Sequence, residues 1–363
     1  MRAVRVDRLS AEAFRLPTDQ QESDGTLAWD ATTVVVVHAS GGGATGLGYT
    51  YSALETARLI TSMLADVVTG ADVMHVEACY QGMRRQTRNV GSAGIASAAI
   101  SAVDVALWDL KARVLDLPLV SLLGASRESV PAYGSGGFTS YSVERLQEQL
   151  AQWAAEGFHA VKMKVGRHPE DDAGRVAAAR AAIGGGTALF VDANGAYDRA
   201  QAAACARDFA AYGVSWFEEP VTSDDREGLR LVRDRAPAGM EIAAGEYGYH
   251  PWYFRRLAEA GAVDIMQADA TRCGGVTGFM RAAAICDAWC LPLSAHTAPQ
   301  LHTHLCGAAA RARNLEYFHD HVRIEQLLFE GAVRPSAGRM APDLSRPGLG
   351  IELRRREAAR FAV

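Results

Sequence analysis

Short apolar segments recur every 20 to 30 residues in the second part of the chain, and each ends at or next to an ionisable side chain. Alanine- and arginine-rich stretches of helical length, such as residues 171–183 and 199–212, separate these segments. Strands that alternate with helices are typical of parallel βαβ units. The segments span residues 159–164, 188–192, 214–218, 241–246, 263–269, 292–296 and 314–316. The pattern predicts an α/β protein with a (β/α)7β TIM-type barrel whose strand ends face one pocket.

The residues before the barrel predict an α+β region. Residues 2–16 and 32–38 have the pattern of strands, and residues 53–68 and 92–115 have the pattern of helices. Residues 17–31 are polar and contain glycine, which predicts a loop.

The glycine-rich stretch 41–49 follows the second predicted strand. It lacks the Gly-Lys-Ser/Thr ending of a phosphate-binding loop, so we interpret it as the turn of a small antiparallel sheet. We expect three parts in the chain. They are an α+β capping domain in residues 1–125, the barrel in residues 126–320, and a C-terminal tail, residues 321–363, that returns to complete the capping domain.

Composition and charge narrow the classes of function. Of the 363 residues, 49% are hydrophobic and 22% are charged, and the net charge is −5 with no basic block. We therefore expect neither a nucleic acid nor a membrane as partner. The N-terminal residues contain no apolar signal core, which favours a cytoplasmic protein. The six cysteines include no C-x-x-C spacing, which predicts reduced thiols instead of disulfides or a zinc site.

Three carboxylates stand at the ends of successive predicted strands: Asp192, Glu218 and Glu246. Converging carboxylates repel one another unless a cation lies between them. A set of oxygen ligands without histidine or cysteine favours Mg²⁺. The sequence therefore predicts a Mg²⁺ site at these side chains. Glu219, the next residue, is expected to point the other way, toward a lysine or an arginine.

Lysine and histidine side chains flank the predicted metal site. Lys162 and Lys164 are two residues apart on one strand, so both face the same side. Two ammonium groups in one pocket lower the pKa of a lysine, which makes a proton-accepting lysine possible. Asp269 and His296 end neighbouring strands and are expected to form a hydrogen-bonded dyad. This arrangement fits abstraction of a proton α to a carboxylate that is held at a metal.

Glu316 ends the last predicted strand of the barrel. We expect it to hydrogen-bond a substrate carboxylate if it is protonated, or else to stabilise the enolic charge. The other histidines at this end of the chain lack an acid on a neighbouring strand, and we interpret them as structural. They are His302, His304, His319 and His321.

With these residues the chain resembles the enolase superfamily, and within it the mandelate racemase subgroup. The resemblance covers the whole length and rests on a combination of short motifs. They are ALWDLK at 106–111, VKMKVG at 161–166, VDAN at 191–194, WFEEP at 216–220, AGE at 244–246, DATRCGGVT at 269–277 and SAH at 294–296.

The resemblance implies a role for each of these side chains. The three strand-end carboxylates bind Mg²⁺. Lys164 is the base on one face of the substrate, and Lys162 contacts the substrate carboxylate. His296, paired with Asp269, is the acid or base on the other face, and Glu316 assists the enediolate.

The resemblance also implies substrate contacts. Part of the capping domain closes over the substrate in this family, which assigns Trp29, within the predicted loop, and Tyr51 to substrate binding. Asn194 is expected to contact the substrate or metal-bound water. Arg272 fits an anion contact and a salt bridge on the barrel face equally well.

The resemblance implies α-proton abstraction but does not fix the step that follows. We expect an acid-sugar dehydratase, which expels the β-hydroxyl of an aldonate or aldarate and yields a 2-keto-3-deoxy acid. Racemisation or epimerisation of a 2-hydroxy acid is the alternative. A cycloisomerase or dipeptide epimerase fits less well, because those relatives resemble a pattern with a second lysine on the sixth strand. A barrel that binds acid sugars without turnover is a further alternative. The expected partner is a small carboxylate, and family members are usually homo-oligomers.

Overall fold

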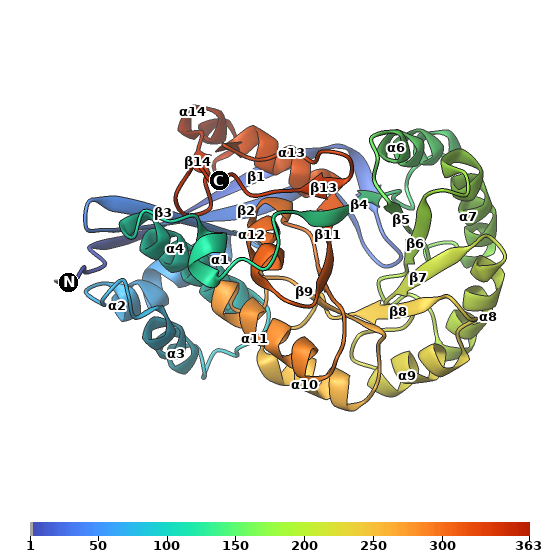
Figure 1. Cartoon of the computed structure of the whole chain (residues 1–363), viewed down its shortest axis with the longest axis horizontal. Coiled ribbons are helices and arrows are strands. Elements are labelled where there is room, and N and C mark those ends of the chain that lie inside the picture. The colour runs from blue at the N-terminus through green and yellow to red at the C-terminus, as the bar shows by residue number, and fades with distance from the viewer. Residues whose placement is uncertain (1–2) are drawn as a thin grey trace.

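Parallel strands close into a barrel in the computed structural model, which describes residues 3–363 (Figure 1). Neighbouring strands pair in chain order, and the last strand pairs with the first, so the predicted barrel is confirmed. Its eight strands within the described residues are β4 (Val130–Gly136), β5 (Ala160–Lys164), β6 (Ala188–Asp192), β7 (Val214–Glu218), β8 (Glu241–Ala244), β9 (Ile265–Ala268), β10 (Leu293–Ala295) and β11 (Ala312–Phe318).

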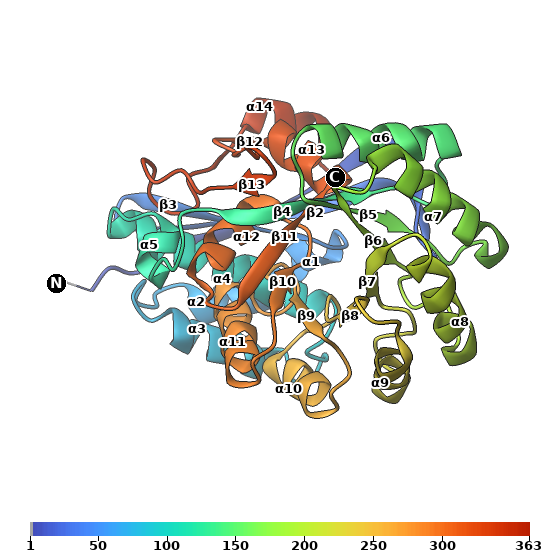
Figure 2. The same ribbon diagram turned by 45° about the vertical axis from the view of Figure 1, so that its right-hand side comes forward.

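A helix follows each barrel strand and covers the outside of the barrel (Figures 1 and 2). Polar side chains fix where several of these helices begin. Ser142 accepts a hydrogen bond from the backbone of Arg145, and Asp198 forms a capping box with Gln201. The helices are α6 (Val143–Ala155), α7 (Pro169–Ile183), α8 (Arg199–Ala210), α9 (Arg226–Arg235), α10 (Pro251–Glu259), α11 (Gly275–Ala288), α12 (Pro299–Ala308) and α13 (His319–Leu328).

A cluster of buried apolar side chains fills the part of the barrel interior away from the C-terminal ends of the strands. The rings of Phe190 and Trp216 are stacked with their centroids 4.9 Å apart, and Tyr133 packs against both. Ala160 and Ile265, the first residues of their strands, complete this buried cluster. The polar strand ends therefore meet at the opposite, C-terminal end of the barrel, where active sites of this architecture lie.

The N-terminal part begins with an antiparallel sheet of β1 (Arg8–Ser23), β2 (Ala28–Gly41) and β3 (Ala44–Tyr51). Gly42 and Gly43 form the tight turn between β2 and β3, and both have positive φ, which this turn type requires. The predicted turn in the glycine-rich stretch is therefore confirmed. The helices of this part are α1 (Glu55–Leu59), the π-helical turn η1 (Ile60–Leu64), α2 (Ala65–Val68), α3 (Val76–Gln86), α4 (Ile95–Val114) and α5 (Leu119–Leu123). The predicted helical stretches 53–68 and 92–115 contain α1 to α2 and α4, whereas α3 and α5 lie outside these stretches. Helix α4 packs on β2 and β3.

The predicted loop over residues 17–31 is wrong. Strands β1 and β2 continue through most of it and leave a turn at residues 24–27. The pairing register shifts between Pro17 and Glu22, and this irregularity hides the period-two pattern that identifies a strand in the sequence. At the tip, a Cβ added to Gly25 would lie 2.4 Å from the carbonyl oxygen of Ala193, so the hairpin touches the barrel.

The C-terminal segment runs back along the barrel to the first sheet. Its backbone pairs with β4 at one point, and Val363 N donates to Ala13 O at 3.1 Å. Its elements are β12 (Phe329–Glu330), β13 (Arg339–Met340), β14 (Glu352–Leu353), α14 (Arg355–Ala358) and the 3₁₀ turn η2 (Ala359–Phe361).

Two further expectations concern the chain as a whole. All six cysteines are free thiols, which confirms that prediction. Among residues 3–363 no helix combines the length and the apolar character needed to cross a membrane.

Candidate active site

Three buried carboxylates converge at the C-terminal end of the barrel. Asp192 and Glu218 are the last residues of β6 and β7 and are paired in register, and Glu246 follows β8 by two residues. One oxygen from each carboxylate lies within 4.8 Å of the other two, so the set is close enough to hold one metal ion. The structure therefore brings together the three predicted metal ligands.

The two lysines of β5 lie against these carboxylates. Lys162 Nζ is 2.5 Å from Glu218 Oε1, and Lys164 Nζ is 2.5 Å from Asp192 Oδ2. Lys162 is fully buried and does not border the cavity above, so its contact with a substrate carboxylate stays a prediction. Lys164 does border that cavity.

The expected lowering of a lysine pKa is wrong for this arrangement. Burial favours neutral lysines, but the charge of Asp192 outweighs it and raises the pKa of Lys164 above its usual value. For Lys162 the charges of Glu218 and Glu316 have the same effect on the pKa. Each lysine thus has a carboxylate oxygen 2.5 Å from its Nζ, a contact that the spacing of the two lysines in the sequence does not reveal.

The carboxylates themselves show a shortage of positive charge. Burial and the charge of Asp192 raise the pKa of Glu218 well above its ordinary value, despite Lys162 beside it. Glu246 Oε2 is buried and accepts no hydrogen bond, although His296 Nε2 is 3.3 Å away. A divalent cation would satisfy both groups, and an all-oxygen donor set suits Mg²⁺.

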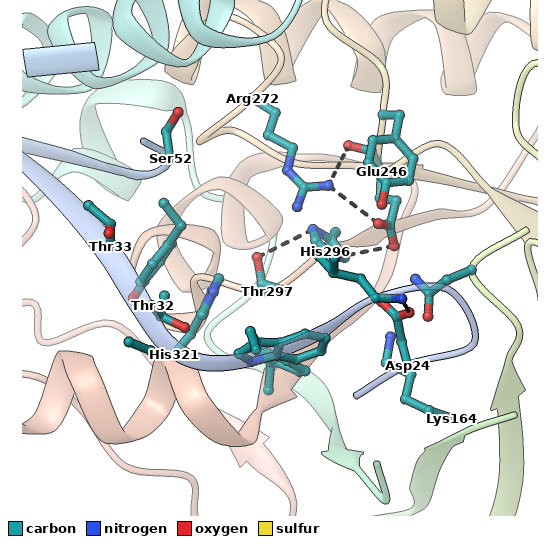
Figure 3. A pocket seen from close by; sticks show the side chains of 17 residues that line it. Asp24, Thr32, Thr33, Ser52, Lys164, Glu246, Arg272, His296, Thr297 and His321 are labelled. Atoms are coloured by element: carbon teal, nitrogen blue, oxygen red, sulfur yellow. Dashed lines mark hydrogen bonds and ion pairs between the residues drawn. The ribbon is translucent and has the colours of Figure 1, made fainter. Parts of the chain in front are cut away.

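The predicted histidine–aspartate dyad is formed. His296 and Asp269 each follow their strand by one residue, and His296 Nδ1 is 2.9 Å from Asp269 Oδ2. Burial, which raises the pKa of Asp269, is outweighed by the hydrogen bond from His296, so this pKa is held below its usual range. The other ring nitrogen, Nε2, faces Glu246 and the cavity (Figure 3). The carboxylate therefore orients the ring and leaves Nε2 for chemistry.

Glu316 lies on β11, beneath the cavity, and is fully hydrogen-bonded. Its carboxylate accepts from Ser135 Oγ at 2.6 Å and from Thr297 N at 2.9 Å, and Lys162 Nζ is 2.9 Å away. Burial alone would raise its pKa, but the charges of Lys162 and His296 hold the pKa well below the usual value. Glu316 is therefore ionised in this structure, which contradicts the protonated form considered from the sequence.

A cavity of about 350 Å³ lies between the barrel mouth and the β1–β2 hairpin. Lys164, His296 and Glu246 border it from the barrel side (Figure 3). Trp29 borders it from the hairpin. Volumes of this size are typical of sites for small molecules. The side chains of the candidate site therefore face a cavity that both parts of the chain line.

All four side chains predicted to contact the substrate border this cavity: Trp29, Tyr51, Asn194 and Arg272. Arg272 Nη1 is 3.3 Å from Glu246 Oε1 and its Nε is 3.5 Å from Asp269 Oδ2. Both readings of Arg272 therefore apply, because it forms ion pairs and also faces the cavity.

His321 differs from the prediction that it is purely structural. It borders the cavity, and its ring stacks on Tyr51 with centroids 3.4 Å apart. Burial holds its pKa well below the usual value. In contrast, both ring nitrogens of His302 contact backbone groups, and His304 likewise bonds to the backbone, as expected for structural histidines.

Other cavity residues were missed by the sequence argument. Tyr247 and Thr297 directly follow predicted site residues, so their position at a strand end was a usable signal. Those from the N-terminal strands and the residues next to them carried no such signal, because the fold alone brings them to the barrel mouth. They are Asp24, Leu27, Ala31, Thr32, Thr33 and Ser52.

Glu219 also departs from expectation. Its side chain is buried, and it forms no ion pair with any lysine or arginine of the described chain. Its backbone has φ +38°, an uncommon conformation for a residue other than glycine. Burial and the charge of Glu246 raise the pKa of Glu219 well above its usual value.

Comparison with known proteins assigns both parts of the chain to described families. Residues 15–124 match the family described as Mandelate racemase / muconate lactonizing enzyme, N-terminal domain. Residues 145–358 match the family described as Enolase C-terminal domain-like. A relative from Streptomyces coelicolor, named 3,6-anhydro-alpha-L-galactonate cycloisomerase, is 32% identical, and the match covers 99% of each chain.

Solved structures agree with this assignment. A mandelate racemase/muconate lactonizing enzyme-like protein from Rubrobacter xylanophilus is 54% identical with a TM-score of 0.97, over 99% of this chain and 100% of the other. The L-talarate/galactarate dehydratase from Salmonella typhimurium, liganded with Mg and L-lyxarohydroxamate, is 28% identical with a TM-score of 0.91. That match covers 100% of this chain and 94% of the dehydratase.

Proposed function

This chain belongs to the mandelate racemase/muconate lactonizing enzyme family of the enolase superfamily, and we propose that it is a Mg²⁺-dependent acid-sugar dehydratase. In this proposal the enzyme removes the proton α to the carboxylate of an aldonate or aldarate. The enediolate that results then loses its β-hydroxyl, and a 2-keto-3-deoxy acid is released.

One observation carries the proposal. A lysine and a histidine border the same cavity and approach the carboxylate triad at different members: Lys164 at Asp192 and His296 at Glu246. A substrate held at the triad would lie between these two proton-transfer groups. Such a pair supports removal of a proton at one carbon and delivery of a proton to a neighbouring oxygen.

Asp192, Glu218 and Glu246 would hold the Mg²⁺, because their donor set and the unpartnered Glu246 oxygen fit a hard divalent cation. When bound, Mg²⁺ supplies positive charge that stabilises the negative charge developing on the substrate carboxylate and that relieves the attraction of the triad for the lysines.

The protein side chains perform the proton transfers. With the negative charge of the triad neutralised, the positive charge of Lys162 favours the neutral form of Lys164, and this neutral amine accepts the α-proton. His296 Nε2 gives a proton to the departing β-hydroxyl, while Asp269 holds the ring in the orientation that exposes Nε2. The hairpin that borders the cavity would limit the access of bulk water to the enediolate.

A different final step, isomerisation instead of dehydration, is the second candidate. It is suggested by the Streptomyces coelicolor relative, which is named as a cycloisomerase and matches over the full length. The reaction would begin with the same proton abstraction and yield an isomer of the substrate instead of a dehydrated acid. Racemisation or epimerisation would also conserve mass.

A panel of aldonates, aldarates and anhydro-sugar acids, incubated with enzyme and MgCl₂, separates these endings. Mass spectrometry and a colorimetric assay for 2-keto acids read each reaction. The proposal expects a product lighter by one water that carries a keto group, and loss of that product in EDTA. A product of unchanged mass would establish an isomerase. Turnover that is indifferent to EDTA would contradict the metal assignment.

A further inference from the structure

A second cluster of potential metal ligands lies outside the candidate active site. Asp19 and Glu22 belong to β1, in the part of the hairpin that spans the barrel mouth, and His319 is the first residue of α13. One ligand atom from each side chain lies within 4.8 Å of the other two. Asp19 Oδ2 is 3.0 Å from His319 Nε2, so the cluster connects two segments 300 residues apart in sequence.

Glu22 is the unusual member of this cluster. Its side chain has no exposed surface, and its Oε1 has no hydrogen-bond partner. Its Oε2 accepts a hydrogen bond from Trp29 Nε1 at 2.8 Å. A buried carboxylate oxygen without a donor costs free energy, so the site calls for a donor or a cation that the protein does not provide.

The surroundings of Glu22 also contain more negative than compensating positive charge. Asp19 and Asp320 lie nearby, and burial together with these acids raises the pKa of Glu22 to about 8. Arg323 is the nearby positive side chain, and its charge only partly offsets these acids. Its Nη2 donates to Asp320 Oδ1 at 2.7 Å and to Pro17 O at 2.6 Å, whereas its Nε has no hydrogen-bond partner. No positive side chain within the described residues forms an ion pair with Glu22.

We propose that Asp19, Glu22 and His319 bind a divalent transition-metal ion such as Zn²⁺, which fastens the hairpin to α13. One imidazole nitrogen and two carboxylates form a donor set that suits Zn²⁺, whereas the all-oxygen triad in the barrel suits Mg²⁺. Asp19 and His319 are partly exposed, which provides an entry path for the ion and room for water ligands.

The bound metal would also act on the cavity. Glu22 would bind the ion and hold Trp29 at the same time, and Trp29 borders the cavity and packs edge-on against Phe138. Occupancy of the cluster would therefore fix one wall of the cavity together with the hairpin. This inference goes beyond the proposed reaction and holds whichever acid is the substrate.

Equilibrium dialysis of chelator-treated protein against ZnCl₂ with excess MgCl₂ tests the inference, with bound zinc measured per chain by atomic absorption. Wild type is expected to bind one zinc ion that His319→Gln binds about tenfold more weakly or worse. His75→Gln removes an exposed histidine elsewhere and is expected to bind zinc as wild type does. Asp192→Asn disables the barrel triad and is expected to retain this zinc ion.

Two results would overturn the inference. One is equal zinc binding by wild type and His319→Gln; the other is loss of all zinc in Asp192→Asn. If His319→Gln does not fold, Asp19→Asn replaces it, because that partly exposed carboxylate tolerates an isosteric change. The assay measures zinc without any sugar, so its failure and the failure of the proposed dehydratase reaction are separate results.

Discussion

At the scale of single residues, the protonation of the site depends on a few short distances. Lys164 Nζ contacts Asp192, and His296 Nδ1 contacts Asp269, so each proposed proton-transfer group has a carboxylate partner and also borders the cavity. Glu316 is ionised because Lys162 and two hydrogen-bond donors surround it. Side chains of the same residue type therefore differ in protonation and in expected role, although the sequence alone does not distinguish them.

Replacement of either proposed proton-transfer group should strongly reduce turnover while the fold survives. We expect Lys164→Ala and His296→Asn each to lower kcat by about 10³-fold, within the range that general acid–base groups contribute. Steady-state kinetics measure the loss, and far-UV circular dichroism checks the fold. Lys111→Ala, on α4 away from the cavity, is the matched control. Wild-type activity in either site variant would refute the two-base assignment.

At the scale of elements, strand ends and the hairpin contribute in different ways. The barrel strands place the carboxylates, the lysines and the dyad in fixed register. The β1–β2 hairpin closes the cavity, and its tip fits against the barrel loops only because Gly25 has no side chain. The barrel strands thus fix the positions of the candidate catalytic side chains, and the hairpin forms a wall of the cavity.

Gly25→Ala should disturb closure without unfolding the chain. Its new methyl group would meet Ala193 O at 2.4 Å and Val165 O at 2.7 Å, so the tip must move away. Because small displacements at a site lower rates strongly, we expect kcat/KM to fall about tenfold or more. Gly174→Ala in α7, where the added carbon meets nothing within 4 Å, should leave kcat/KM unchanged. Equal kinetics for both variants would show that the tip contact is irrelevant.

Glu325 in α13 provides a prediction for stability against pH. Burial raises its pKa from 4.5 to about 8, although Tyr49 and the backbone of Gln300 donate to it. The unfolded chain loses this proton near pH 4.5 and the folded chain near pH 8. The contribution of Glu325 to stability is therefore complete at low pH and decreases by about 1.4 kcal/mol per pH unit between these values.

Glu325→Gln removes this titration and keeps one acceptor oxygen for the two donors, Tyr49 and Gln300 N. Urea unfolding at pH 5, 6.5 and 8 should show that the variant gains stability relative to wild type as the pH rises. A constant difference between the two proteins across this range would contradict the assigned pKa.

The sequence predicts more of the barrel than of its cap, for a physical reason. A strand end such as Asp192 or Glu218 is marked by the apolar run before it, so position and chemistry are visible together. The hairpin lacks this mark because its register shift breaks the alternation. The role of His321 and the charge of Glu316 depend on neighbours far away in sequence, and no local pattern reports them.

At the scale of the whole molecule, the N-terminal sheet and the barrel are joined by buried polar contacts. Tyr49 on β3 donates to Glu325 at 2.6 Å, and Thr50 donates to Thr271 O at 2.7 Å, next to the dyad. The C-terminal segment adds the bond between Val363 and Ala13. The cavity therefore lies between two parts that are fixed to each other by contacts outside it.

Mg²⁺ should stabilise the whole fold, because it relieves repulsion among three buried carboxylates. At a Mg²⁺ concentration a hundred times Kd we expect about 2.7 kcal/mol of added stability, seen as a higher Tm in calorimetry. Asp192→Asn should lose this increase. A wild-type Tm that is the same in EDTA and in MgCl₂ would contradict the triad as a metal site.

The most direct test of α-proton abstraction is hydrogen exchange in D₂O with Mg²⁺ and an acid sugar that the wild type converts. His296→Asn keeps the proposed base but lacks the proton donor for the β-hydroxyl. It should incorporate deuterium at the α-carbon of recovered substrate and form no keto acid, as mass spectrometry and NMR report. Lys164→Ala should do neither. Deuterium uptake at the wild-type rate in Lys164→Ala would contradict the role of Lys164 as the base. Formation of keto acid by both variants without any deuterium uptake would contradict α-proton abstraction by this pair of side chains.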